Sequence, residues 1–596
     1  MFQSFQVTAR PEQGPPRLAA LRAEIARAGL DGFLIPRADA HQGEYVAPRD
    51  ERLAWLTGFT GSAGFCVALG DVAGVFIDGR YRTQVKAQVA DVYTPVPWPD
   101  VNLSAWLKEQ LPHGGKIGFD PWLHAAGQIS TAEMELEDSG IELVRSDNLV
   151  DRVWENQPAP PMNPVKAHPL EFAGEAARDK ITRLASGVQD AGCTAALITL
   201  PDSIMWLLNI RGSDIAYNPV AHGFAILHAA GQVDLFMAAQ KLVEVRDHLG
   251  DEVSIHDPVD FLDAVQKLDG RVQVDAGTVP QIVADVLGDK MVDGGDPCAL
   301  PKACKNLAEI AGSAEAHLRD AVAVVETLCW LDAQQPGSVT ETQVVTRLEH
   351  NRRKDNALQD ISFDTISGTG PNGAIMHYRV TEETDNQLQN GHLLVLDSGG
   401  QYLDGTTDIT RTIAIGEVGD DEKACFTRVL KGMINLSMLR WPVGLAGRDI
   451  ECIARAPLWL AGQDFNHGVG HGVGAYLSVH EGPQRLSRVS HVPLRPGMIL
   501  SNEPGYYREG AFGIRIENLV VVEDAPALPG GDDERAMLHW RTLTYVPIDR
   551  RLIVVDMLTA AERSWLNGYH HDVAEKIRPR LGPDAQLWLD AATAPV

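Results

Sequence analysis

Hydrophobic and polar positions follow two different periods along the chain, and the order of those periods repeats. Near the N-terminus a helical pattern at 17–30 leads into a strand pattern at 31–36, and another strand pattern follows at 72–78. Later in the chain a helical pattern at 180–192 again leads into a strand pattern at 194–200. Alternating helices and strands predict an α/β fold in both regions.

A short shared motif strengthens the case for a repeat. The stretch IMWLLNIRGSD (204–214) matches LAWLTGFTGSA (53–63), and both contain a tryptophan followed six residues later by Gly-Ser. The two copies lie about 150 residues apart, which indicates two related α/β domains produced by duplication.

Two breaks in the pattern indicate domain limits. The stretch at 155–170, ENQPAPPMNPVKAHPL, is rich in proline and has little periodicity, as expected of a linker. A second break falls near 295–305 (GGDPCALPKAC). We therefore predict three domains, at 1–158, 159–304 and 305–596.

The third region has a different pattern. An amphipathic helix is predicted at 313–334, and a second helix at 340–354 begins with a Thr cap and a Gln at the third helical position. Strand patterns and Gly-rich turns then dominate from about 361 to 550. The stretch AAERSWLNGYHHDVAEKIRP, within 560–596, predicts a helix that closes this region, although its role cannot be read from the sequence.

Composition narrows the classes of partner. The net charge is −28 and the pI is near 5.0, which argues against nucleic acid or an anionic membrane as a partner. The seven cysteines are scattered and include no Cys-x-x-Cys pair, so we expect reduced thiols and a cytoplasmic location. No signal-peptide pattern or long uncharged apolar run is present, so neither secretion nor membrane insertion is expected.

The most unusual polar residues lie in the third region, in LVLDSGGQYLDGTTDITRTIAI (394–415). Here Asp397, Asp404 and Asp408 stand next to apolar runs that read as buried strands. A buried carboxylate is costly unless it is paired, hydrogen-bonded or bound to a metal. Asp404 precedes a glycine and is best explained as a turn residue.

Three further segments add candidate ligands and acid–base groups. They are GPNGAIMHYR (370–379), NHGVGHGVGAYLSVHEGP (466–483) and SNEPGYYREGAFGIRIENLVVV (501–522). Carboxylates gathered in one apolar neighbourhood would raise one another's pKa, and divalent cations would remove that conflict. Such an oxygen-rich site suits two ions of Mn²⁺, Co²⁺ or Zn²⁺. The candidate ligand set is Asp397, Asp408, His471, Glu503 and Glu517.

The connection between the two aspartate-bearing strands limits this hypothesis. A tight hairpin at Asp404-Gly405 would put Asp408 opposite Gln401, about 13 Å from Asp397 at roughly 3.3 Å per residue. One site could not hold both carboxylates at that distance. If the metal hypothesis holds, we therefore expect a broader or bulged connection, which Gly399-Gly400 can provide, rather than a two-residue turn.

At this point the chain resembles a known family. The third region is similar to the metal-dependent "pita-bread" peptidases, family M24, and the whole chain is most similar to three-domain aminopeptidase P (Xaa-Pro aminopeptidase). Accompanying motifs are DAHQGEYVAPRDER (39–52), GFTGSAG (58–64), DGRY (78–81) and NIRGSD (209–214). The resemblance implies two creatinase-like N-terminal α/β domains followed by a pita-bread catalytic domain.

The resemblance also assigns roles to the candidate ligands. Asp397 resembles the bidentate ligand of one metal ion, and Asp408 and Glu517 resemble carboxylates that bridge both ions. His471 and Glu503 look like the ligands that complete the second ion. Glu503 is also placed by the family pattern to take the proton of the attacking water.

A second group of residues resembles the family's substrate-contacting residues. His377 and His480 correspond to groups that contact substrate and the tetrahedral intermediate, and His467 to a hydrogen-bond donor near the proline. Arg80, in the DGRY motif, corresponds to an arginine that reaches the substrate from the N-terminal domain. Tyr507 and Arg515 have counterparts that line the site.

The implied reaction is release of the N-terminal residue from peptides with proline in second position, by a metal-bridging water with Glu503 as general base. The implied cofactors are two divalent ions, most often Mn²⁺, and the implied assembly is a homodimer. The alternatives are a prolidase that splits free Xaa-Pro dipeptides, and a non-catalytic peptide-binding member of the fold. A binding-only member is expected to have lost metal ligands, whereas this chain keeps a full set.

Overall fold

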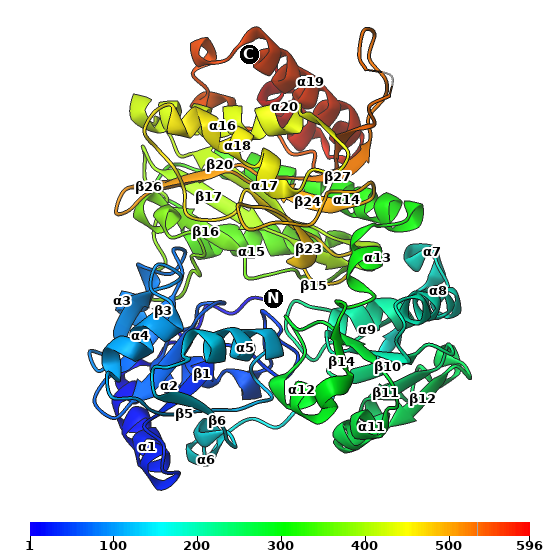
Figure 1. The fold of residues 1–596 in the computed structure, drawn as a ribbon. Helices are drawn as coiled ribbons and strands as arrows, with labels where there is room; N and C mark the ends of the chain where they lie inside the picture. Colours follow the sequence, from blue (N-terminus) through cyan, green and yellow to red (C-terminus); the bar gives the residue numbers. More distant parts are fainter. Residues whose placement is uncertain (533) are drawn as a thin grey trace. The chain divides into compact units, whose positions relative to one another are not determined.

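The computed structural model of the chain describes residues 1–532 and 534–596 (Figure 1). These residues form two compact units. One comprises Thr8–Leu170 and Glu175–Ala299, and the other comprises Met1–Val7, Glu171–Gly174 and Leu300–Val596. The predicted domain limits at 158/159 and 304/305 remain predictions.

The first unit contains two six-stranded sheets with one topology. The strand orders are β4-β3-β2-β1-β5-β6 and β12-β11-β10-β8-β13-β14, with the same sequence of parallel and antiparallel pairs. The strands are β1 (Gly32–Pro36), β2 (Phe65–Leu69), β3 (Ala73–Ile77), β4 (Thr94–Pro97), β5 (Gly115–Phe119), β6 (Ile141–Arg145), β8 (Ala195–Ile198), β10 (Phe224–His228), β11 (Val233–Phe236), β12 (Val253–His256), β13 (Val272–Val274) and β14 (Met291–Asp293). The predicted duplication of an α/β unit is confirmed.

The helices of this unit follow from the apolar pattern. In α1 (Gly14–Arg27), Leu18, Leu21 and Ile25 are buried along one stripe. The helices α2 (Arg52–Thr57) and α9 (Pro201–Leu208) carry the two copies of the tryptophan motif, and each lies in the connection between the first two strands of its sheet. Further helices are α4 (Leu103–Gln110), α5 (Ala126–Glu135), α6 (Leu149–Val153), α8 (Ala177–Asp190), α11 (Phe261–Lys267) and α12 (Gln281–Leu287).

The second unit contains the long helices and antiparallel sheets expected of the third region. One sheet has the order β16-β17-β20, another β21-β28-β27-β24-β22-β23, and a third β15-β18-β19; β25 pairs with β26. The strands are β15 (Leu358–Ile361), β16 (Ile366–Thr369), β17 (Leu393–Ser398), β18 (Gly400–Tyr402), β19 (Gly405–Thr406), β20 (Ile409–Ala414), β21 (Arg440–Pro442), β22 (Gly470–Gly472), β23 (Glu481–Leu486), β24 (Ile499–Asn502), β25 (Gly505–Arg508), β26 (Phe512–Arg515), β27 (Asn518–Asp524) and β28 (Met537–Thr542).

The helix ends in this unit are set by caps. The predicted helix at 313–334 begins earlier, as α14 (Leu307–Asp332), because Asn306 caps it and Glu309 completes a capping box. The helix α15 (Glu341–Arg352) begins after Thr340 as predicted, with Gln343 at its third position. The other long helices are α16 (Asp420–Ser437), α18 (Cys452–Trp459), α19 (Ala560–Ile577) and α20 (Pro583–Ala592).

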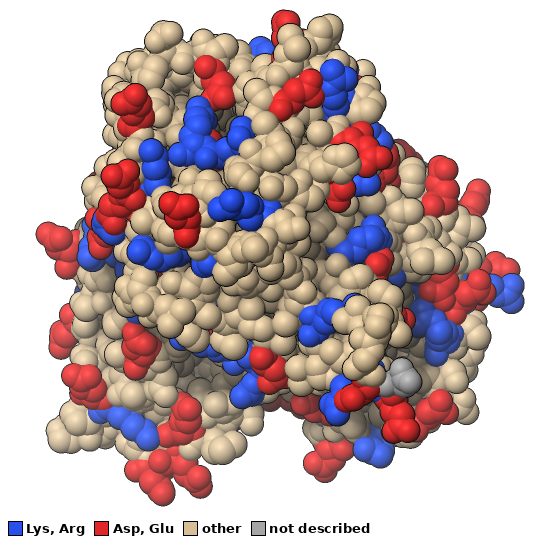
Figure 2. Space-filling view, turned by 90° about the horizontal axis from the view of Figure 1, so that it is seen from above, with Lys and Arg blue, Asp and Glu red and all other residues tan. Residues whose placement is uncertain are grey.

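The described surface carries charged side chains of both signs, and the described helices can be compared with the expectation that the chain does not span a membrane. On the face shown in Figure 2, acidic and basic side chains are interspersed over a largely uncharged surface. Within the described part of the chain, no helix is both long and apolar enough to cross a lipid bilayer.

The hairpin that carries Asp397 and Asp408 differs from its prediction. The pairs Ser398–Ile409 and Gln401–Thr406 keep one register, and the tip is a two-residue turn at Leu403-Asp404. The expectation that the connection is not a two-residue turn is therefore wrong. The turn lies one residue earlier than assumed, which places Asp408 only two residues from the position opposite Asp397 and brings the pair within diagonal reach.

Gly399 makes this hairpin possible, and its replacement should be costly. A Cβ atom at Gly399 would lie 1.9 Å from the Thr407 carbonyl oxygen and 2.1 Å from Ser362 Oγ. We expect Gly399→Ala to lower the free energy of unfolding by about 3 kcal/mol through overpacking, as measured by urea denaturation. As a control, Gly568→Ala in α19 meets no atom within 4 Å and should stabilise the protein by up to about 1 kcal/mol. Equal effects of both substitutions would contradict this account of Gly399.

Candidate metal centre

Strands from two sheets bring together three of the predicted ligands. Asp408 immediately precedes β20, His471 lies on β22 and Glu517 immediately precedes β27, and one ligand atom from each lies within 4.8 Å of the others. His471 Nε2 is 3.4 Å from Asp408 Oδ2 and 3.6 Å from Oε1 of Glu503, which follows β24. Four residues distant in sequence therefore meet at one point.

The hydrogen bonds of His471 prepare it to bind a cation. Its Nδ1 lies 2.9 Å from the Gly472 carbonyl oxygen, which only accepts, so Nδ1 carries the proton. Its Nε2 therefore presents a lone pair to the carboxylates, as a metal-binding histidine does. Ser501 Oγ accepts a hydrogen bond from the His471 main-chain N–H (2.9 Å), and its hydroxyl donates to Glu503 Oε1 (3.3 Å).

Two buried carboxylate oxygens at the site lack a hydrogen bond. Thr410 Oγ1 donates to Glu517 Oε2 (2.8 Å), and Arg515 Nη2 donates to Asp397 Oδ2 (2.5 Å). The other oxygens, Glu517 Oε1 and Asp397 Oδ1, have no hydrogen-bond partner among the described residues. Buried, unsatisfied carboxylate oxygens are what a divalent cation would ligate, so the residues present fit the ions that the sequence predicts.

The electrostatics of the cluster point the same way. Burial, together with the charges of Asp397 and Glu503, raises the pKa of Asp408 well above its ordinary value. Burial and the neighbouring carboxylates likewise raise the pKa of Glu517, and burial raises that of Glu503. A cation would remove this repulsion and restore the ionised forms.

A hydrogen-bonded chain leads away from the carboxylates. Arg515 Nη1 donates to the Tyr507 hydroxyl (2.6 Å), and that hydroxyl donates to His467 Nε2 (2.9 Å). His467 Nδ1 donates to the Gly468 carbonyl oxygen (2.7 Å), which fixes the tautomer. Burial raises the pKa of Tyr507 to about 12, so its hydroxyl remains a neutral donor. The structure thus joins Asp397, Arg515, Tyr507 and His467 in one network.

The remaining predicted residues lie in different settings. The ring of His480 is 4.3 Å from that of His471, in an edge-on arrangement. His377 is partly exposed in the turn that follows the short helix Gly370–Ala374. Arg80 lies in the other compact unit, after β3, where its Nη2 is 2.7 Å from Asp78 Oδ2. The substrate-contacting roles of these three residues stay predictions. Asp404 lies in the turn as expected, and Arg319 Nη2 bonds its carboxylate at 2.9 Å.

Some supporting residues were missed by the sequence reasoning. Thr410 lies two residues after Asp408, so strand alternation could have placed it on the same face. Ser501 lies two residues before Glu503 in the same way. Glu481, which follows His480, is buried between Lys302 and Lys305, 3.1 Å from Lys302 Nζ, and only the tertiary fold reveals this contact.

Glu341 anchors the segment that precedes and includes His377. Its carboxylate accepts hydrogen bonds from the Thr369 and Asn386 main-chain N–H groups (2.7 and 3.1 Å), the Tyr378 hydroxyl (2.9 Å) and the Asn372 amide (3.1 Å). Burial nevertheless raises the pKa of Glu341 to about 7. Its sequence position, at the start of a helix, gives no sign of this role.

This raised pKa gives the protein a predictable pH dependence. Unfolded Glu341 loses its proton near the ordinary glutamate pKa of 4.5, whereas burial in the folded protein raises this pKa to about 7. Between these values the folded state binds more protons, so its stability should fall as pH rises from about 4.5 to about 7, by up to about 3 kcal/mol. Urea denaturation of wild type and Glu341→Gln at pH 5 and 7.5 measures this fall. An equal fall in the variant would show that Glu341 is not its source.

Comparisons with known families cover nearly the whole chain. Residues 309–524 match the model of metallopeptidase family M24, and 536–596 match the C-terminal region of that peptidase. Residues 17–153 and 156–309 each match a creatinase/prolidase N-terminal domain.

Named relatives and a solved structure agree with these matches. Aminopeptidase P2 of Arabidopsis thaliana is 38% identical over 95% of this chain and 86% of its own. A probable Xaa-Pro aminopeptidase P of Coccidioides posadasii is 37% identical over 98% of this chain and 100% of its own. The crystal structure of the X-prolyl aminopeptidase from Caenorhabditis elegans, described as a cytosolic enzyme with a di-nuclear active site, superimposes with a TM-score of 0.93 and 32% identity, covering 98% of this chain and 99% of that one. The chain therefore belongs to the aminopeptidase P (Xaa-Pro aminopeptidase) group of the M24 metallopeptidases.

Proposed function

We propose that this metalloexopeptidase releases the N-terminal residue from peptides with proline in second position, at the centre formed by Asp408, His471, Glu503 and Glu517. The observation that carries the proposal is the convergence of these ligand atoms, with unsatisfied oxygens on buried carboxylates. The reaction class follows from the family of the chain. The individual roles below are assigned to residues of the site described above.

Five residues would hold two divalent ions. They are Asp397, Asp408, His471, Glu503 and Glu517. Bound there, the ions would polarise the peptide carbonyl and lower the pKa of water to near neutrality. We assign Mn²⁺ to the site because carboxylate-rich ligand sets suit it, with Co²⁺ and Zn²⁺ as alternatives.

Glu503 is assigned the general base. Ser501 donates to Oε1 of Glu503, which leaves Oε2 to accept the proton of the attacking water. The same carboxylic acid would then return the proton to the leaving proline nitrogen.

Histidines and an arginine are assigned to the substrate. His480, next to His471, and His377 would donate to the developing oxyanion. The network of Arg515, Tyr507 and His467 presents a fixed set of polar groups beside the carboxylates and would position the proline side. Arg80 would contribute from the first α/β domain.

The proline preference has a chemical basis. An Xaa-Pro bond has no N–H and a fixed ring, so a peptidase that must hydrogen-bond that N–H cannot use it. A centre that acts on the carbonyl and on the nitrogen lone pair has no such requirement. We further assign the limits 1–158, 159–304 and 305–596 to the three domains from the breaks in the sequence pattern, a cytoplasmic location from the scattered cysteines, and a homodimeric state from the family resemblance.

Three peptides test the proposal. Chelated enzyme, with and without added Mn²⁺, is given Arg-Pro-Pro, Arg-Pro and Arg-Ala-Ala, and release of Arg is measured. We expect metal-restored cleavage of the tripeptide Arg-Pro-Pro alone. Cleavage of Arg-Pro alone would instead make the protein a prolidase, and cleavage of Arg-Ala-Ala as well would remove the proline preference. Activity on none of them would favour a peptide-binding role.

A further inference from the structure

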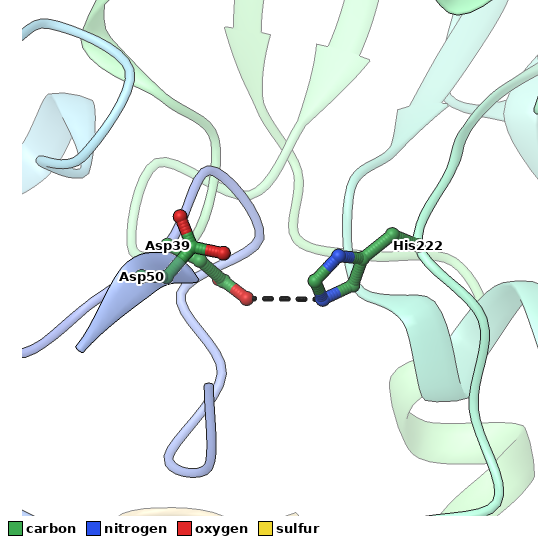
Figure 3. Close-up of side chains that lie close together, drawn as sticks. All are labelled: Asp39, Asp50 and His222. Carbon is green, nitrogen blue, oxygen red and sulfur yellow. Dashed lines mark ion pairs between the residues drawn. The ribbon is translucent and has the colours of Figure 1, made fainter. Parts of the chain in front are cut away.

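A second cluster of metal-binding side chains lies outside the catalytic unit. Asp39 follows β1, Asp50 ends the short helix Pro48–Asp50, and His222 lies in the loop before β10. One ligand atom from each lies within 4.8 Å of the others. Figure 3 shows the two aspartates, from the loop of the first sheet, facing the imidazole from the loop of the second.

We propose that Asp39, Asp50 and His222 bind a divalent transition-metal ion that links the two α/β sheets. One imidazole and two carboxylates form a ligand set suited to Zn²⁺ or Mn²⁺. This site is separate from the catalytic centre and shares no residue with it.

The first argument is the geometry between Asp39 and His222. Asp39 Oδ2 and His222 Nε2 lie 3.2 Å apart, yet neither atom makes a hydrogen bond with any described residue. Two ligands about 2.1 Å from one Zn²⁺ ion, at 90–109° from each other, are about 3.0–3.4 Å apart. The separation is thus that expected of two ligands to one ion.

The second argument is that the loop holds the carboxylate in place. The main-chain N–H groups of His41 and Gly43 donate to Asp39 Oδ1 at 2.9 and 3.3 Å. This leaves Oδ2 directed at His222, and the Asp39 side chain is only 3% exposed. On the other side, the His222 main-chain N–H donates to Asp214 Oδ2 (2.8 Å) and fixes that loop. Preorganised ligands with outer-shell partners are typical of metal sites.

The third argument is charge. Asp50 Oδ1 accepts from Arg52 Nη1 (2.8 Å), but Arg52 also forms two hydrogen bonds to Asp151, at 2.6 and 2.9 Å. Arg49 approaches Asp50 only to 4.0 Å. With Asp39, the carboxylates of Asp50 and Asp151 outnumber the two arginine side chains, Arg49 and Arg52. A divalent ion would balance the excess.

The test requires a background without catalytic ions. In the full chain, Asp397→Asn combined with Asp408→Asn removes ligands of the catalytic centre. Dialysis of this variant against Zn²⁺, followed by metal analysis, should leave about one ion per chain. Adding His222→Gln should remove that ion. The matched control is His228→Gln, because His228 Nε2 forms an ordinary ion pair with Asp234 Oδ2 at 2.8 Å in the same sheet, and it should leave the ion in place.

Two outcomes would overturn the proposal. If the double variant binds no Zn²⁺, or if His222→Gln leaves the bound Zn²⁺ unchanged, Asp39 and His222 form only an ion pair. Should the double variant fail to fold, crystals of the wild-type protein soaked in Zn²⁺ provide the second measurement. An anomalous-scattering peak at bonding distance from His222 Nε2 is expected there, and its absence would equally overturn the proposal.

Discussion

Asp408→Asn should abolish peptide cleavage and, at the same time, stabilise the metal-free protein. Asp408 is buried, and this burial together with repulsion by Asp397 and Glu503 raises its pKa. A neutral amide of the same shape removes one charge from that repulsion. We expect the free energy of unfolding of the metal-free variant to rise by about 0.5–2 kcal/mol, the usual range for a single stabilising substitution. Loss of this proposed metal ligand should lower kcat/KM by about 10³-fold or more.

Both effects are measured on the same preparations. Urea denaturation in the presence of a chelator gives the stability, and hydrolysis of Arg-Pro-Pro with Mn²⁺ gives the activity. The control is Asp404→Asn, four residues away in the same hairpin, where the carboxylate pairs with Arg319. That variant should lose stability and keep most of its activity. A metal-free Asp408→Asn protein less stable than wild type would contradict the charge repulsion described for the centre.

Arg515→Gln should have the opposite effect on the metal-free protein. Arg515 is 3% exposed and bonds both Asp397 and Tyr507, so it is a positive charge buried within the carboxylate cluster. Removing one partner of a buried ion pair typically costs about 3–5 kcal/mol, because the other charge remains buried. With the ions bound, Asp397 would keep a counter-charge. The variant should therefore be strongly destabilised in chelator and much less so in excess Mn²⁺.

Thermal and urea unfolding with chelator and with Mn²⁺ would measure this difference. Arg508→Gln serves as the control: Arg508 lies in the adjacent strand β25, is 39% exposed and pairs with Asp421. An exposed pair contributes about 0.2–1 kcal/mol, independent of the metal. If Arg515→Gln were destabilised equally with and without metal, the coupling between Arg515 and the ions would be refuted.

Much of the fold follows from local patterns. The helices α1, α8, α14 and α15 were predicted from apolar stripes and caps, and the duplicated sheets from one repeated motif. Local patterns do not predict the exact start of α14, because the cap at Asn306 begins the helix earlier than the apolar stripe indicates. They also do not predict the hairpin tip, where the turn lies one residue before the expected position and different side chains face each other. The register of the hairpin, which sets the turn at Leu403-Asp404, is not contained in the local pattern.

The centre was predicted in part for a similar reason. Carboxylates beside apolar strands are unusual in a sequence, so the pattern alone indicates Asp397, Asp408 and Glu517 as candidate ligands. The pattern does not indicate the residues that support these ligands. Thr410, Ser501 and Glu341 look ordinary in sequence, and only the tertiary structure shows that their hydrogen bonds hold charged groups in place. The assignment of Arg80 depends on family resemblance alone.

The division of the ligands between two sheets has a consequence for the timing of metal uptake. Asp397 and Asp408 come from one three-stranded sheet, whereas His471, Glu503 and Glu517 belong to the six-stranded sheet or its connections. Neither sheet holds the complete proposed set, and the last proposed ligand lies at residue 517. On this assignment, the five ligands would come together during synthesis only when both sheets have formed and met. Metal binding would then be coupled to the meeting of the two sheets, and would not precede it on the emerging chain.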